Sequence, residues 1–157
     1  MSMTLISEQV LASAAASVTF SSIPQTYTDL VLEVTYLNTT AASHLWFTLN
    51  GDSGTNYSRT RIYGDGTTAV SDRTSNVSYI DGIYADTTNR AVASVAIQSY
   101  ANTATYKTAL FRQSNSASAA ATFVGLWRST AAVTSVTFTA GSSQIAAGST
   151  FRLYGVR

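Results

Sequence analysis

Residues 20–37 constrain the fold of this chain more than any other stretch. They contain its only proline, Pro24, between two segments that alternate as β-strands do. In the second segment, every other residue from Leu30 to Tyr36 is large and apolar or aromatic, as expected of a strand that covers a core. Proline lacks an N–H and biases the residue before it toward an extended backbone, so it belongs at a strand end. The stretch predicts a strand, a corner and a second strand, and with them an all-β fold.

Short alternating segments continue along the rest of the chain, separated by turn signals. Asn50-Gly51 is the clearest of these signals, because both residues tolerate positive φ. Gly82 interrupts a weaker segment at 77–84 and predicts a β-bulge. Residues 67–76 are polar and unpatterned, which indicates a loop or an edge excursion, and the serine- and alanine-rich residues 114–121 indicate a link.

About nine or ten strand candidates result, at spacings of roughly 8 to 15 residues, with no segment of helical period. Several connections are too long for tight hairpins. The pattern therefore predicts a single-domain, jelly-roll-like antiparallel β-sandwich.

The sandwich domain is expected at residues 17–157, after an N-terminal segment at 1–16. That segment reads as a short strand (residues 5–11) or as an arm lying on a neighbouring molecule. It has no basic region before its small-residue run, so it does not resemble a signal peptide. We expect residues 17–23 to lie close to residues 151–156, with Pro24 at the corner where the chain leaves one sheet for the other.

Composition argues against several classes of partner. Charged residues make up 11% of the chain, against about 25% in an average domain. The net charge is +1 and Lys107 is the only lysine, so no basic patch for nucleic acid or for a membrane surface is visible. A surface rich in hydroxyl groups suits packing against other proteins, where dense charge would have to be desolvated. Many extracellular β proteins, however, simply share this composition.

The inventory of reactive residues argues against an enzyme. His44 is the only histidine, cysteine is absent, and no Gly-x-Ser-x-Gly elbow is present. The acidic residues lie mostly in turns, where they usually accept backbone hydrogen bonds. Residues 50–56 carry oxygen ligands at alternate positions, loosely like a calcium loop, but lack the bidentate glutamate. We expect a hairpin turn there, and neither a metal nor a cofactor.

Aromatic residues supply the best candidates for a binding surface. Nine tyrosines, six phenylalanines and two tryptophans are enough to fill a core and leave some rings outside. Arginine and aromatic residues are enriched at interface hot spots, and aromatic clusters also stack on sugars. The predicted interface patch consists of Trp46, Tyr57, Arg59, Arg61 and Tyr63.

Three stretches together resemble a known family. They are residues 18–32, the centre Phe-Thr-Leu-Asn-Gly-Asp at 47–52 followed by Asn-Tyr-Ser at 56–58, and the ending Gly-Ser-Thr-Phe-Arg-Leu-Tyr-Gly-Val-Arg at 148–157. The arrangement resembles small virion proteins of tailed bacteriophages, known as capsid decoration (cement) proteins or tail-fibre proteins. The resemblance implies a jelly-roll subunit, a homotrimer, bound to the major capsid protein on the exterior of the virion.

Two functions follow from this resemblance. The first is a cement subunit that stabilises the capsid shell, with attachment strengthened by multivalency. The alternative is a tail-fibre or head-fibre receptor-binding module that holds host surface glycans, although the chain has no repeat from which to build a long shaft.

Overall fold

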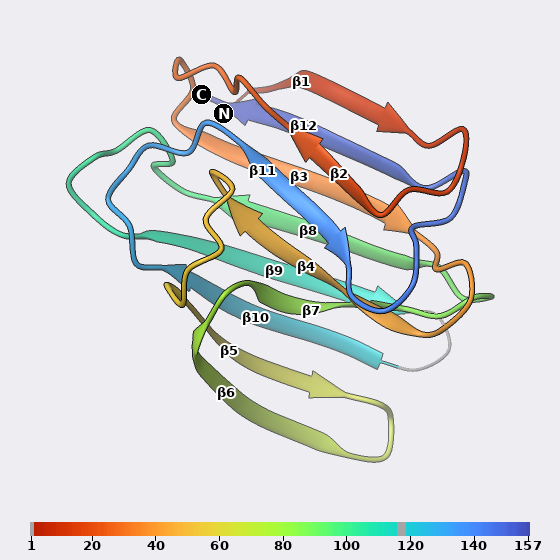
Figure 1. Ribbon diagram of the computed structural model, residues 1–157. Coiled ribbons are helices and arrows are strands. Elements are labelled where there is room, and N and C mark those ends of the chain that lie inside the picture. The colour runs from red at the N-terminus through yellow and green to blue at the C-terminus, as the bar shows by residue number, and fades with distance from the viewer. Residues whose placement is uncertain (1, 116–118) are drawn as a thin grey trace.

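The computed structural model describes residues 2–115 and 119–157, and within them the chain forms twelve strands and no helix (Figure 1). The strands are β1 (Met3–Val10), β2 (Ser17–Phe20), β3 (Asp29–Tyr36), β4 (Ser43–Leu49), β5 (Tyr57–Gly64), β6 (Ala69–Val77), β7 (Ile80–Ala85), β8 (Ala91–Ile97), β9 (Lys107–Asn115), β10 (Ala119–Trp127), β11 (Val136–Ala140) and β12 (Thr150–Val156).

Two antiparallel sheets face each other. The larger has eight strands in the order β1-β12-β3-β8-β9-β10-β5-β6, and the smaller has four in the order β2-β11-β4-β7. Because the smaller sheet has half as many strands, β5 and β6 extend past its edge strand β7 at the bottom of Figure 1. We call the β5–β6 hairpin the wing. The architecture is a jelly-roll-like antiparallel β-sandwich, as the sequence predicted.

The core lies between the sheets and follows the alternation in the sequence. Every second residue of β3 from Leu30 to Tyr36 is at most 1% exposed. Phe47 of the smaller sheet meets Phe111 of the larger edge-on, with ring centroids 5.2 Å apart, and Phe111 stacks on Phe123 at 4.4 Å. The predicted core strand is thus confirmed at the centre of the larger sheet.

Pro24 marks the point where the chain changes sheets. The strand before it, β2, belongs to the smaller sheet and the strand after it, β3, to the larger. Tyr100 donates a hydrogen bond from its hydroxyl to the Pro24 carbonyl. The same switch explains why residues 17–23 do not run beside β12 as a neighbouring strand. Residues 17–20 form β2, which pairs with β11 in the facing sheet, while β12 lies between β1 and β3.

The N-terminal segment forms the edge strand of the larger sheet. β1 pairs with β12, with a register shift between Leu5 and Ser7. Residue 1 of this segment lies outside the described residues. At the other edge, the residues expected as a loop at 67–76 mostly form β6, where Asp72 makes ion pairs with β5. The link expected at 114–121 consists partly of strand, and its residues 116–118 lie outside the described residues.

Two glycine predictions differ in outcome. Asn50 and Gly51 both have positive φ, 52° and 66°, and form the predicted turn. The turn does not close a hairpin, because β4 and β5 belong to different sheets. The predicted bulge at Gly82 is confirmed, since the pairing with β4 skips that residue. A Cβ atom on Gly82 would lie 2.6 Å from the Phe123 ring, so a side chain at this position would collide with the core.

Candidate functional site

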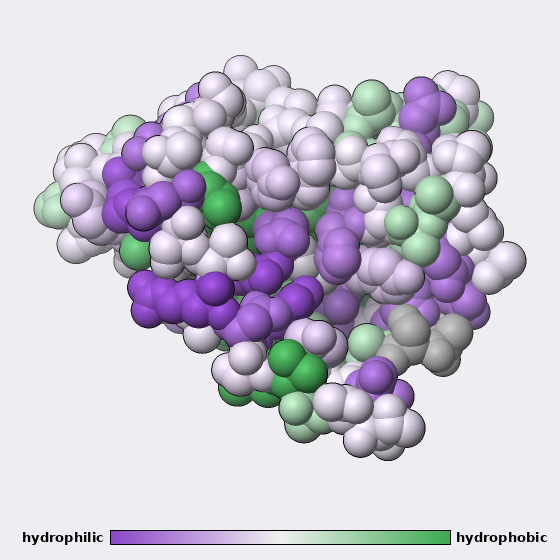
Figure 2. Space-filling view, turned by 60° about the horizontal axis from the view of Figure 1, so that its bottom comes forward, coloured by the Kyte–Doolittle hydropathy of each residue, from purple (hydrophilic) through white to green (hydrophobic). Residues whose placement is uncertain are grey.

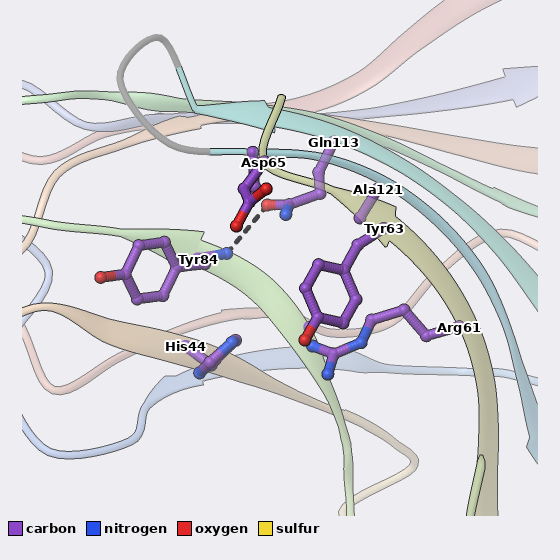
Figure 3. A pocket seen from close by; sticks show the side chains of 9 residues that line it. His44, Arg61, Tyr63, Asp65, Tyr84, Gln113 and Ala121 are labelled. Carbon is purple, nitrogen blue, oxygen red and sulfur yellow. Dashed lines mark hydrogen bonds between the residues drawn. The ribbon is translucent and has the colours of Figure 1, made fainter. Parts of the chain in front are cut away.

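A cleft of about 330 Å³ separates the edge of the smaller sheet from the wing (Figure 3). Its size lies at the lower end of ligand pockets, about 300–1,000 Å³. Polar and aromatic side chains form the walls, and residues with small side chains or none line the rest: His44, Arg61, Tyr63, Asp65, Gly82, Tyr84, Gln113, Ala119 and Ala121. The hollow exists because Gly82, Ala119 and Ala121 leave space between β5 and β7, the strands that carry Tyr63 and Tyr84.

The position of β5 decides which of its side chains reach this cleft. Its odd-numbered residues from Tyr57 to Tyr63 point to the inner face of the sheet. Tyr57 lies under the smaller sheet and is fully buried. Arg61 and Tyr63 lie beyond the edge of the smaller sheet and are half-buried. The Arg61 guanidinium carbon lies 4.5 Å from the centroid of the Tyr63 ring, a cation–π contact that fixes both side chains.

An ion-pair network holds the wing against β7. Arg59 is 6% exposed; it pairs with Asp81 of β7, and its Nη2 lies 3.1 Å from an oxygen of Asp72 on β6. Arg61 Nε donates to the other oxygen of Asp72 at 3.2 Å. Burial raises the pKa of Asp72, but the two guanidinium groups outweigh it and leave that pKa below its usual value. Two cations and two anions balance, so the network adds no net charge.

One end of the cleft carries polar groups. Gln113 is 9% exposed, and its Oε1 accepts a hydrogen bond from the Tyr84 N–H at 2.9 Å, while its Nε2 donates to none of the described residues. Asp65 accepts hydrogen bonds from the backbone N–H groups of Thr67 and Thr68, which lower its pKa. Figure 3 shows the Asp65 and Gln113 side chains directed toward the same part of the cleft.

Aromatic rings surround the cleft and continue over the outer face of the smaller sheet. Trp46 stacks on Tyr79 with ring centroids 4.4 Å apart, and His44 lies 5.1 Å from the Tyr84 ring. Burial lowers the pKa of His44, which favours the neutral imidazole. All of these rings are half-buried. We call this set the aromatic rim: His44, Trp46, Tyr63, Tyr79 and Tyr84.

The surface around the wing is chemically mixed. Figure 2, in which the wing side of the molecule is turned forward, shows hydrophilic residues gathered in a band across this face and near-neutral residues over most of the remainder. This view agrees with a chain in which 11% of residues are charged.

The predicted interface patch is only partly at the surface. Trp46, Arg61 and Tyr63 lie on the cleft side, as expected of surface residues. Tyr57 and Arg59 were wrongly placed, since they are 0% and 6% exposed. The Tyr57 hydroxyl accepts a hydrogen bond from the Leu49 N–H at the end of β4 and is placed to donate to the carbonyl of Leu49 or of Asp52, so its polar group is satisfied although the ring is buried. Burial also raises the pKa of Tyr57 to about 12.

Sequence reasoning did not assign four residues of this region to the site: Asp65, Tyr79, Tyr84 and Gln113. His44, the only histidine of the chain, lies in the rim. Only the pairing of β4 with β7 brings it opposite Tyr84, and no local pattern reveals that pairing.

The turn at 50–56 uses its oxygens internally. Asp52 accepts hydrogen bonds from the Gly54 N–H at 2.8 Å, from the Asn56 amide at 2.9 Å and from the Trp127 indole at 2.6 Å. The indole bond is the main reason that the pKa of Asp52 is lowered. Across residues 2–115 and 119–157, no group of three histidine or acidic side chains is placed to hold a metal ion. The same residues include no helix that is long and apolar enough to span a membrane.

Comparison with known proteins assigns no family. No protein-family model matches the chain, and no curated protein matches it. Among solved structures it is similar to the galectin LEC-6 of Caenorhabditis elegans, with 12% sequence identity over 96% of this chain and 95% of that chain, and a TM-score of 0.36. At this level of similarity, the likeness carries no argument about ligands or partners.

Proposed function

We propose that this protein is a non-enzymatic structural protein of a tailed-phage virion, a decoration subunit that binds the major capsid protein on the outside of the shell and stabilises it. The resemblance of residues 18–32, 47–52, 56–58 and 148–157 to small virion proteins supports the location. Each subunit buries area across neighbouring shell proteins, and attachment through several subunits raises avidity beyond one contact.

The aromatic rim is the observation that carries this proposal. Its rings are held by stacking and by the strands beneath them, so little side-chain entropy is lost when a partner covers them. Tryptophan, tyrosine and arginine are the residues that most often dominate interface energetics. Trp46 of β4 and Tyr79, which lies just before β7, stack next to the neutral ion-pair network. We assign the shell contact to this side.

The test is binding of the purified protein to particles that lack it, measured by co-sedimentation. We expect saturable binding to the shell, weakened about tenfold or more by Trp46→Ala, as for an interface hot spot. Ile62→Ala is the matched control, since Ile62 is a large apolar residue that is 59% exposed on the opposite face. Binding confined to the tail, or equal loss with both variants, would contradict the proposal.

The cleft favours a second candidate function, binding of an uncharged glycan. The Tyr63 ring forms one wall on which a sugar ring can stack, and the Gln113 Nε2 offers a donor that no described residue uses. The charge of Arg61 is paired with Asp72, and the Asp65 carboxylate disfavours an anionic ligand in the cleft.

A glycan array with purified protein separates the two functions. If the cleft binds glycans, Tyr63→Ala abolishes the signal and Trp46→Ala leaves it unchanged, because Trp46 does not line the cleft. Absence of binding to every glycan on the array would remove this candidate.

A further inference from the structure

The outer face of the eight-stranded sheet, on the side away from the aromatic rim, has no function so far. Because the strand registers are continuous from β12 to β10, the side chains on this face form rows across the strands. One row is apolar over six successive strands: Leu5, Tyr154, Val31, Ala96, Leu110 and Val124. Three of its members are large and exposed, at 49% for Leu5, 42% for Leu110 and 41% for Val124. A contiguous apolar row on a protein surface marks an interaction site.

The neighbouring row carries charges in an ordered pattern. It reads Glu8, Arg152, Glu33, Ser94, Arg112 and Thr122 across the same six strands. Glu8 and Arg152 form an ion pair with each other. Within the described residues, Glu33 and Arg112 make no ion pair, and they flank Ser94 symmetrically on the strands either side of β8. A shallow hollow of about 300 Å³ lies between them.

We propose that two copies of this chain associate face to face through this surface, about a two-fold axis that runs along β8. This axis exchanges β3 with β9 and β12 with β10. Glu33 of each copy then faces Arg112 of the other, twice per dimer. In the apolar row Val31 faces Leu110, and Tyr154 faces Val124. Ala96, Ser94 and Val92 lie on the axis and face their own counterparts, and the small side chains of Ala96 and Ser94 allow close approach.

The charges select this axis over its neighbours. A two-fold axis along β3 would place Glu33 against itself, and one along β9 would place Arg112 against itself. Like charges directly opposed across an interface are unfavourable. Of these three axes, only the one along β8 places Glu33 of each copy opposite Arg112 of the other.

The available area sets the strength of the association. The five strands from β12 to β10 span about 24 Å at about 4.8 Å per strand, and seven residues extend about 23 Å. They offer about 550 Å² per copy and about 1,100 Å² in total, near the lower limit of specific interfaces. The dimer is accordingly weak and reversible.

Cysteine crosslinking tests the axis directly. The chain has no cysteine, so an introduced thiol is unique. Ser94→Cys places the thiol on the axis, and we expect a short bifunctional thiol crosslinker to give covalent dimer in high yield. Ser71→Cys on β6 is the matched control: it lies on the same face and in the same row, but on a strand with no counterpart across the axis. Equal yields from the two variants would overturn the proposal.

Sedimentation velocity over about a hundredfold range of concentration tests the contact itself. We expect a monomer–dimer equilibrium that Arg112→Glu weakens about tenfold and that the double variant with Glu33→Arg restores, because opposite charges again face each other. Arg73→Glu makes the same charge change on the same face outside the contact and leaves the equilibrium unchanged. A monomer at all concentrations, or the trimer that the family resemblance implies, would overturn the proposal.

Discussion

The two outward sides of the sandwich hold their side chains in different ways. On the cleft side, rings and charges have fixed partners: Trp46 stacks on Tyr79, and Arg61 is held by Asp72 and by Tyr63. On the outer face of the larger sheet, exposed aliphatic and small hydroxyl side chains lie among charged ones such as Arg73 and Arg112, and one ion pair is formed among the described residues there, between Glu8 and Arg152.

This difference indicates two kinds of contact. A surface of immobilised rings around a cleft presents a specific shape before any partner arrives, so it suits recognition of a different molecule. A sheet face with an apolar row and alternating charges is suited to packing against a similar sheet, where alignment comes from register and area rather than from pockets. We therefore expect substitutions on the two sides to affect different measurements.

The largest expected effect distinguishes buried from exposed members of the predicted patch. Tyr57→Ala removes a fully buried ring and its hydroxyl contacts, and we expect it to lower the free energy of unfolding by about 4 kcal/mol. Trp46→Ala removes a half-buried ring and should cost about 1 kcal/mol or less. Urea denaturation measures both. Comparable losses would mean that the division of the patch into core and surface is wrong.

The next effect concerns the attachment of the wing. Arg59→Met removes the cation that joins Asp72 and Asp81 and leaves both carboxylates without it. Because these carboxylates are 33% and 32% exposed, water can hydrate them, and we expect a loss of about 2 kcal/mol, below the value for a fully buried pair. Dimerisation through the opposite face should be unchanged by sedimentation velocity. A simultaneous loss of dimer would contradict the independence of the two sides.

The smallest effect is a pH dependence confined to the cleft side. Burial lowers the pKa of His44 below its ordinary value of 6.5, so the unfolded state binds the proton more readily than the folded state. The contribution of neutral His44 to the free energy of unfolding is complete above pH 6.5 and is lost as the pH falls through the folded-state pKa of His44. We expect thermal stability to begin to decline below that pH, and His44→Gln to lack this first decline. An unchanged profile in the variant would show that burial of His44 does not contribute.

Much of the fold could be predicted from periodicity. The alternation on residues 30–36, the proline before them and the glycine at position 82 each act locally, and the structure confirms a core strand, a change of sheet and a bulge. The neighbours of each strand could not be predicted in this way. Residues 17–23 have the same alternation whether they pair with β11 or with β12, because pairing depends on contacts between distant residues.

The site was predicted less well for the same reason. The odd-numbered residues of β5 share one face, and their alternation does not say where the covering sheet ends. Tyr57 and Tyr63 look equivalent in sequence, yet the edge of β7 passes between them and buries only the first. Gln113 and Tyr84 reach the cleft from strands that are distant in sequence, so no local pattern links them to Arg61.

Electron cryomicroscopy of the virion is the most direct test of the proposal that the two sides serve different contacts. We expect the chain at regular positions over the capsid shell, with Trp46 and Tyr79 against the coat protein and the outer face of the larger sheet turned away from the shell, where a second copy can pair with it. Density for the chain at the tail alone, or an orientation that leaves the aromatic rim in solvent and lays the larger sheet on the shell, would contradict it.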